Sequence, residues 1–514
     1  MGRSEYFLGI DMGTTSVKAG IFDAHGQTIA SADAAYPLYT PKSGWAEQNP
    51  AEWWAAACTA TRQMIAISGI DPQDIIGMSV DTTCCTVLFA DEHMNILRPA
   101  IMWMDMRASK QAKRITATGH PMLKFNGYGN VSAESMPAKA LWVKEHEPEI
   151  YAKAKHVFEC TDWLMHKLTG RLVASMSTTS PRWYYDKPNG GWPVSFYESF
   201  GLGDVLEKFP QEVLGLGTKV GPLLPDVAQE MGLVPGIPVG EGGADAFVGM
   251  LGLNVVNPGS IALITGSSHL VLGLTETEMH AKGMWGSYPD AVIPGLGLVE
   301  GGQTSTGAIV NWFKTNFCGH MEAEAKAQGK SVYDLLNAGA ENLPVGADGL
   351  LALDYFQGNR APYADPDVRG MFYGLSLLHT PMHLYRAIIE SICYGTEAIM
   401  ESFRGGGMQP SEIYVAGGAV KSKFWMQTHA DVCNLPIYIP EVAEAPCLGS
   451  AMLGAVACGY YSDIQTAAQH MVSMKDKIEP DLARHQAYMF YFEQYKKAYQ
   501  DSKDWMHAVT THIL

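Results

Sequence analysis

The sequence predicts an α/β protein with two duplicated domains around a central cleft. Short β-rich runs alternate with amphipathic helical segments along the chain, which is the pattern of α/β architecture. A hairpin tip with a glycine and small hydroxyls beside apolar strands occurs twice, at residues 11–20 (DMGTTSVKAG) and 261–274 (IALITGSSHLVLGL). Because 514 residues are too many for one core, we expect a first domain over residues 1–246 and a second over residues 247–514.

The individual elements follow from hydrophobic periodicity. Strands are predicted at residues 7–10, 17–22, 74–81, 261–265, 269–274 and 412–416, and helices at residues 51–68, at 137–154 and from Ser422 onward. A Gly- and Pro-rich connector at residues 220–240 lies between the two groups.

The repeated hairpin has two interpretations. Gly, Asp, Ser and Thr are ordinary turn residues, so each tip is explained by a turn alone. A glycine-rich turn can also aim backbone N–H groups and hydroxyls at a phosphate. Two such tips facing one cleft favour a nucleotide's phosphates, and the candidates are Gly13, Thr14 and Thr15 in the first tip and Thr265, Gly266 and Ser267 in the second. The pair Gly417–Gly418 at a strand end fits either a β–α turn or the close approach of a flat ligand.

Composition excludes several classes of partner. A formal charge of −17 argues against nucleic acid and against an anionic membrane surface. The sequence has no run of 18 apolar residues and no signal peptide, so we expect no membrane span. Nine cysteines without a C-x-x-C motif predict a reduced, cytoplasmic setting. The partner is expected to be a small molecule, and a homodimer is left open.

Residues 370–390, GMFYGLSLLHTPMHLYRAIIE, resemble the C-terminal signature of the FGGY carbohydrate kinase family. The N-terminal signature is less complete: SMPAKALWVKEH keeps Lys139 and Trp142 but has Met136 and Ala140 where the pattern differs. Other family landmarks are GWAEQNPAEWW, WMDMR, TDWLMHKLTG, GGADA, EGGQTSTG, GNRAPYADPDVRG and LGSAMLGAVACG. The resemblance implies two ribonuclease-H-like domains, as in actin, hexokinase and Hsp70, and a kinase that uses ATP and Mg²⁺. The first domain would bind the sugar and the second the nucleotide.

The resemblance also implies roles for two carboxylates. The family's catalytic base is the aspartate of GGADA, which places that role on Asp245, although the residues alone fit a helix N-cap equally well. Asp11 follows an apolar strand and would repel phosphates unless a cation lay between them. We therefore expect Asp11 to orient Mg²⁺ and its waters, with Asp245 sharing that duty.

The sugar-facing candidates lie in WMDMR and VDTTCCT. Asp105 and Arg107 alternate with apolar neighbours, so an extended run would point both to one face, where they could bond adjacent hydroxyls. A surface ion pair is the alternative, and the resemblance favours the sugar. Trp103 could form an apolar wall for the sugar, and Asp81 is a weaker candidate.

The predicted reaction is ATP-dependent phosphorylation of a pentulose at its terminal hydroxyl. GNRAPYAD, STTSPRWYYD and VDTTCCT look closer to ribulokinases than to typical xylulokinases, so D-ribulose comes ahead of D-xylulose. A linear polyol, glycerol or a hexulose is the alternative substrate. A non-kinase ATPase or sensor of the actin-like superfamily is the alternative class, although WMDMR and GGADA together favour the kinase.

Overall fold

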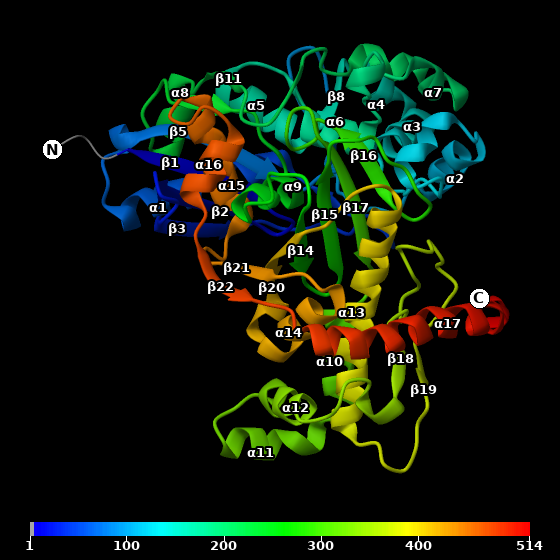
Figure 1. Ribbon diagram of the computed structural model, residues 1–514. Helices are drawn as coiled ribbons and strands as arrows, with labels where there is room; N and C mark the ends of the chain where they lie inside the picture. Colours follow the sequence, from blue (N-terminus) through cyan, green and yellow to red (C-terminus); the bar gives the residue numbers. More distant parts are fainter. Residues whose placement is uncertain (1–4, 514) are drawn as a thin grey trace.

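The computed structural model describes residues 5–513 and contains two seven-stranded sheets, one in each half of the molecule (Figure 1). The first sheet has the order β11-β12-β5-β1-β2-β3, with β13 also beside β5. Its strands are β1 (Tyr6–Met12), β2 (Ser16–Asp23), β3 (Thr28–Ala35), β5 (Ile75–Thr82), β11 (Lys219–Pro222), β12 (Pro238–Gly240) and β13 (Gly243–Ala244).

The second sheet has the order β16-β17-β15-β14-β20-β21-β22. Its strands are β14 (Ser260–Thr265), β15 (His269–Thr275), β16 (Trp285–Pro289), β17 (Gly297–Gln303), β20 (Glu412–Gly417), β21 (Ile437–Pro440) and β22 (Met474–Ile478). In each sheet the first strand starts an antiparallel meander and pairs in parallel, on its other side, with a later strand: β1 with β5, and β14 with β20. This shared topology confirms the predicted duplicated α/β fold.

Smaller sheets extend the two halves. A four-stranded sheet has the order β4-β7-β6-β8, and two further pairs are β10-β9 and β18-β19. Their bounds are β4 (Glu47–Gln48), β6 (Val87–Ala90), β7 (Ala100–Ile101), β8 (His156–Glu159), β9 (Ala174–Ser175), β10 (Val213–Leu214), β18 (Leu351–Leu353) and β19 (Met371–Tyr373).

Seventeen α-helices occur within residues 5–513. They are α1 (Pro50–Ser68), α2 (Ser109–Ala117), α3 (Met136–His146), α4 (Pro148–Lys153), α5 (Cys160–Thr169), α6 (Met176–Trp183), α7 (Val194–Ser199), α8 (Pro225–Met231), α9 (Asp245–Gly252), α10 (Gly307–Phe317), α11 (Glu322–Ala327), α12 (Val332–Glu341), α13 (Pro381–Gly405), α14 (Lys423–Cys433), α15 (Ala445–Ala457), α16 (Ile464–Met471) and α17 (Leu482–Ile513). The helix predicted over 137–154 is two helices, because Pro148 disfavours helical geometry at the preceding Glu147. In the described chain, no helix is long and apolar enough to cross a bilayer.

Helix α15, from the last part of the chain, packs on the first sheet (Figure 1). A side chain on Gly9 would place its Cβ 1.9 Å from the Cys447 carbonyl oxygen, and one on Gly77 would lie 2.3 Å from that of Gly454. Glycine at these strand positions lets the helix backbone approach the sheet closely. The boundary after residue 246 stays a prediction, but the core of the first sheet includes this later helix.

Candidate active site

The β1–β2 tip is fixed at its backbone. The Gly13 N–H donates to the Ser16 carbonyl at 3.0 Å. The Gln48 amide donates from Nε2 to the Thr14 carbonyl at 2.7 Å. Thr15 is exposed, and Gly13 and Thr14 are half-buried. The tip is therefore a preformed turn whose Thr14 and Thr15 keep exposed surface, as phosphate binding requires.

The β14–β15 tip has the same closure. The Gly266 N–H donates to the Ser268 carbonyl at 2.9 Å, and Ser267 is exposed. The carbonyl of Ser267 accepts from the N–H groups of Thr306, at 2.9 Å, and Ala308, at 3.1 Å. The start of α10 is thereby held against this tip, so the second half presents a turn and a helix N-terminus together.

The Thr265 hydroxyl does not face the phosphate side of the tip, where it was expected. Thr265 is buried, and its hydroxyl donates to the Ala416 carbonyl at 2.7 Å and accepts from the Ala419 N–H at 3.2 Å. These bonds tie β14 to the turn after β20. Gly417, the last residue of β20, has a φ of 98°, and a Cβ there would lie 1.8 Å from the Thr265 carbonyl oxygen. Thr265 and Gly417 therefore fix the backbone on which the second tip rests.

A pocket of about 440 Å³ opens beside the second tip. Its walls come from the starts of α10 and α14, from α12 and α13, and from the turn after β20. The lining includes Gly266, Gly307, Asn337, Tyr385, Gly418 and Trp425. A concave site with aromatic walls and a few polar groups suits a small organic ligand. The glycine pair was predicted to meet a flat ligand, and Gly418 lines this pocket.

We expect Gly13→Val and Gly266→Val each to raise the KM for ATP by about tenfold or more, and to raise it more than the KM for sugar. Neither glycine has a positive φ, and a Cβ at either site meets nothing closer than 3.4 Å, so both variants should fold. A valine side chain would block close approach of phosphate to the backbone. Steady-state kinetics with each substrate varied in turn would measure this. Equal rises in both KM values would point to a general defect of that half instead.

Three carboxylates meet at neighbouring strand ends of the first sheet. Asp11 on β1 lies opposite Asp81 on β5, and Asp81 pairs in register with Gly243, two residues before Asp245. Burial, with the nearby charge of Asp11, raises the pKa of Asp245 to about 7, and burial also raises the pKa of Asp11. Burial and the mutual repulsion of these carboxylates favour a proton acceptor at Asp245 that works near neutral pH.

Asp81 lies too deep to contact a ligand in the cleft. It is fully buried, and its Oδ2 accepts from the Ser450 hydroxyl of α15 at 2.6 Å. Burial and the neighbouring Asp11 hold the pKa of Asp81 well above its usual range. This geometry fits a residue that packs behind Asp11 in the sheet, and it does not fit the expected contact with sugar.

The WMDMR segment is not the extended run that its alternation predicted. It follows β7 as two turns. Asp105 and Arg107 have fully buried side chains and pair with each other at 2.8 Å, while Arg107 also pairs with Glu47 at 2.8 Å and stacks on Trp45. The pair therefore anchors the segment rather than opening toward a sugar, and it is a buried pair instead of a surface one. Trp103 keeps 36% of its surface exposed.

Comparison with known proteins decides the family. The model of the FGGY family of carbohydrate kinases matches residues 6–252 with its N-terminal domain and residues 261–458 with its C-terminal domain. The chain belongs to the FGGY family of carbohydrate kinases. It is 34% identical to an FGGY carbohydrate kinase domain-containing protein of Xenopus laevis over 96% of both chains, and 32% identical to a ribulokinase of Halalkalibacterium halodurans over 97% of this chain and 94% of the relative. A xylulose kinase structure from Rhodospirillum rubrum, 25% identical, superposes with a TM-score of 0.86 over 98% of this chain and all of the other.

This FGGY chain is accordingly a sugar kinase, and the family's phosphate donor is ATP. The structure shows the contacts of one signature residue, Lys139. Lys139 of α3 is fully buried, and its Nζ donates to the carbonyls of Cys85, at 2.6 Å, and Met102, at 2.8 Å. It joins the segment after β5 to the WMDMR segment. The signature pattern identified this lysine but did not indicate which backbone groups it binds.

A charged pair that connects the two halves of the FGGY kinase was missed. Arg182 of α6 donates to Glu300 of β17 at 2.7 Å and to the Tyr288 hydroxyl at 2.9 Å. Arg360 lies 3.5 Å from the same carboxylate, and both guanidinium groups lie over the Trp285 ring. STTSPRWYYD and EGGQTSTG contain this pair, but its members are 118 positions apart, so no local pattern joins them.

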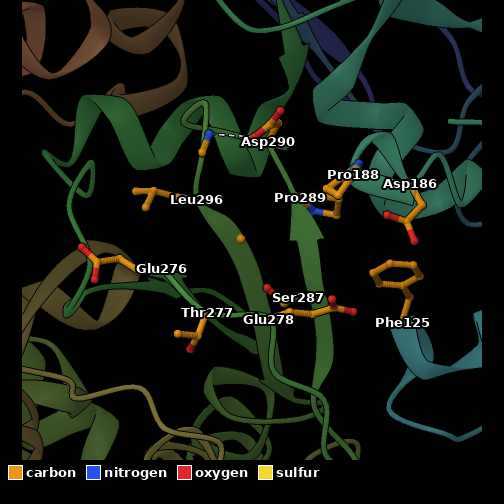
Figure 2. Close-up of a pocket in the computed structure, with 12 residues that line it drawn as sticks. Phe125, Asp186, Pro188, Glu276, Thr277, Glu278, Ser287, Pro289, Asp290 and Leu296 are labelled. Atoms are coloured by element: carbon orange, nitrogen blue, oxygen red, sulfur yellow. Dashed lines mark hydrogen bonds between the residues drawn. The ribbon is translucent and has the colours of Figure 1, made fainter. Parts of the chain in front are cut away.

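A smaller pocket of about 190 Å³ lies at the junction of the two halves (Figure 2). Figure 2 shows Phe125 and Asp186 of the first half facing the strand that carries Ser287 and Pro289. Its full lining is Phe125, Asp186, Pro188, Glu276, Thr277, Glu278, Ser287, Pro289, Asp290, Gly295, Leu296 and Gly297. None of the predicted site residues lines it, so this junction is distinct from the carboxylate cluster.

Two buried histidines of the second half should each cost stability at acid pH, while buried carboxylates with raised pKa values, such as Glu159 and Glu390, act in the opposite direction. Burial lowers the pKa of His429 to about 4 and that of His269 well below its usual value. At these two sites the unfolded chain binds more protons than the folded one as pH falls from about 6.5 toward 4, so each histidine should lower the free energy of unfolding by up to about 1.4 kcal/mol per pH unit. Denaturant unfolding between pH 7 and 5 measures the slope.

Between pH 7 and 5 the free energy of unfolding should fall less, or rise more, in a His429→Gln variant than in wild type, whereas His93→Gln should match wild type. His429 has no exposed surface, whereas the His93 side chain is 77% exposed. Identical slopes in wild type and His429→Gln would contradict the assignment.

Proposed function

We propose that this FGGY kinase transfers the γ-phosphate of ATP to the terminal hydroxyl of a pentulose, with D-ribulose ahead of D-xylulose. The observation that carries the proposal is Asp245, a carboxylate with a pKa of about 7 beside Asp11 at the strand ends of the first sheet. Relatives named ribulokinase and xylulose kinase support a pentulose.

Asp245 would act as the general base. It is the first residue of α9, and its Oδ1 accepts from the Ala246 N–H at 2.7 Å, which fixes the carboxylate and leaves the second oxygen for a substrate hydroxyl. A base of pKa near 7 is half-ionised at neutral pH and can take the proton as the oxygen–phosphorus bond forms.

The two tips would hold the triphosphate. Gly13, Thr14 and Thr15 would approach it from the first half, and Gly266 and Ser267 from the second, with the nucleoside in the pocket beside Gly418. Backbone N–H groups and hydroxyls stabilise the charge of the transferred group without moving during the reaction.

Asp11 and Asp245 fit a Mg²⁺ ion. Within residues 5–513, no group of three or more His, Cys, Asp or Glu side chains forms a ready metal site. Mg²⁺ commonly uses only one or two carboxylates together with waters and substrate phosphates, and its charge would favour the ionised forms of Asp11 and Asp245, whose pKa values burial raises. When bound there it would neutralise phosphate charge.

The sugar would lie between Trp103 and the Arg182–Glu300 pair. The exposed indole offers an apolar face to the carbon chain, while the buried pair, 12% and 4% exposed, can donate to and accept from hydroxyls. Asp105 and Arg107 would act indirectly, by anchoring the segment that carries Trp103.

The substrate assignment is tested by kcat/KM for D-ribulose, D-xylulose, L-ribulose, ribitol, erythritol, glycerol and hexuloses, measured side by side by ADP release. We expect a pentulose to give the highest value. If glycerol or a hexulose exceeds every pentulose by more than about tenfold, a gap of roughly 1.4 kcal/mol in transition-state binding, the pentulose assignment fails.

A further inference from the structure

A hydrogen bond joins the WMDMR segment to the first phosphate tip. The indole Nε1–H of Trp103 donates to the Thr14 Oγ1 at 3.1 Å, across 89 positions of sequence. Trp103 is 36% exposed and Thr14 half-buried, so both partners lie at the surface of the candidate site rather than in the core. One side chain therefore touches the proposed sugar side and the proposed phosphate side at once.

Both ends of this bond are anchored to the same stretch of backbone. The Ala46 N–H donates to Asp105 Oδ2 at 2.6 Å, which fixes the WMDMR segment. Two residues further on, the buried Gln48 amide donates to the Thr14 carbonyl at 2.7 Å and accepts from the Trp53 indole at 2.9 Å. With both parts tied to residues 46–48, the bond between them has a defined geometry and loses little freedom on forming.

The bond also sets the polarity of the Thr14 hydroxyl. An indole N–H is a donor only, whereas a hydroxyl has one O–H and two acceptor lone pairs. With Trp103 donating to the oxygen, the hydroxyl proton must point elsewhere and remains available to an acceptor such as a phosphate oxygen. Accepting one hydrogen bond also strengthens the hydroxyl as a donor.

We propose that Trp103 is a positioning residue for phosphate binding: its indole N–H orients the Thr14 hydroxyl as a donor to the nucleotide's phosphates. Under the proposed function, a sugar packed on the indole also steadies this bond, so that the phosphate tip is fully ordered when the acceptor is in place. The orientation of Thr14 matters only if the β1–β2 tip binds phosphate. The effect of sugar on the bond rests in addition on the proposed function.

The test is a double-mutant cycle on nucleotide affinity without sugar. Trp103→Phe keeps an aromatic face but removes the N–H, and Thr14→Val keeps the shape but removes the hydroxyl. Calorimetry with Mg²⁺ and the non-hydrolysable analogue AMP-PNP should show about three- to tenfold weaker binding in each variant. The double variant should bind no more weakly than the weaker single variant, because one unit has been broken twice. Thr14→Ser, which restores the hydroxyl, should bind within about twofold of wild type.

Controls separate this role from a structural one. Trp54→Phe, on α1, removes a surface hydrogen bond from the indole to Glu230 of α8 and should leave AMP-PNP affinity unchanged. Near-ultraviolet circular dichroism shows whether each variant is folded. Additive losses in the double variant, an unaltered affinity in Trp103→Phe, or no AMP-PNP binding in wild type would overturn the proposal.

A second arm adds D-ribulose to the same titrations. We expect it to tighten AMP-PNP binding to wild type, and to do so at least threefold less in Trp103→Phe; an equal effect in both would overturn the sugar statement. If wild type phosphorylates no sugar, the proposed function fails and the sugar statement with it, while the sugar-free cycle still decides the role of Trp103.

Discussion

An Asp245→Asn variant should turn over at least about a hundredfold more slowly than wild type while still binding sugar. The amide has the shape of the carboxylate but cannot accept a proton from the attacking hydroxyl. Its oxygen can still accept from the Ala246 N–H, so the start of α9 should keep its conformation. The loss should therefore fall on kcat, with the KM for sugar changed far less.

ADP release in a coupled assay gives kcat, and calorimetry with sugar alone gives the affinity. Asp226→Asn is the matched control, because Asp226 also lies in the first turn of a helix of the first half, α8, but is exposed and is not a member of the carboxylate cluster. Its turnover should be near that of wild type. Turnover within about threefold of wild type in Asp245→Asn would remove this carboxylate from the mechanism.

The sheets and hairpin tips could be predicted from the sequence because the patterns that indicate them are local. Apolar runs of four to eight residues define β1, β2, β5, β14 and β15, and a glycine followed by small hydroxyl residues marks each tip. The placement of α15 on the first sheet was not accessible, since nothing in residues 445–457 indicates which sheet its small residues meet. Close approach to Gly9 and Gly77 is visible only in three dimensions.

The candidate site was predictable in its tips and its GGADA aspartate but not in its supporting contacts. In WMDMR, alternating apolar and charged residues imitated a strand, although the charges turn inward because Glu47 and the backbone of Ala46 satisfy them from a distant part of the chain. Thr265 and Thr14 each adjoin the glycine of a tip, and both were predicted to face phosphate. Only the presence of β20 beside Thr265 explains why its hydroxyl faces backbone instead of ligand.

Lys139→Met should lower the free energy of unfolding by about 3 kcal/mol, because it leaves two buried carbonyls without a donor. The lysine Nζ donates to the carbonyls of Cys85 and Met102. Burial lowers the pKa of this ammonium, which shows how completely it is withdrawn from water. Methionine fills most of the volume, so the loss reports the polar contacts rather than a cavity.

Denaturant unfolding at neutral pH would measure the change, with Lys144→Met as the matched control on the same helix. Lys144 pairs with Asp204 at the surface and is 33% exposed, so its loss should cost less than about 1 kcal/mol. The segments that Lys139 joins also carry Trp103, so kcat/KM for sugar should fall in Lys139→Met under conditions where the variant is fully folded. If Lys139→Met is no less stable than Lys144→Met, water or a shifted backbone must satisfy the two carbonyls, and the lysine does not hold these segments together.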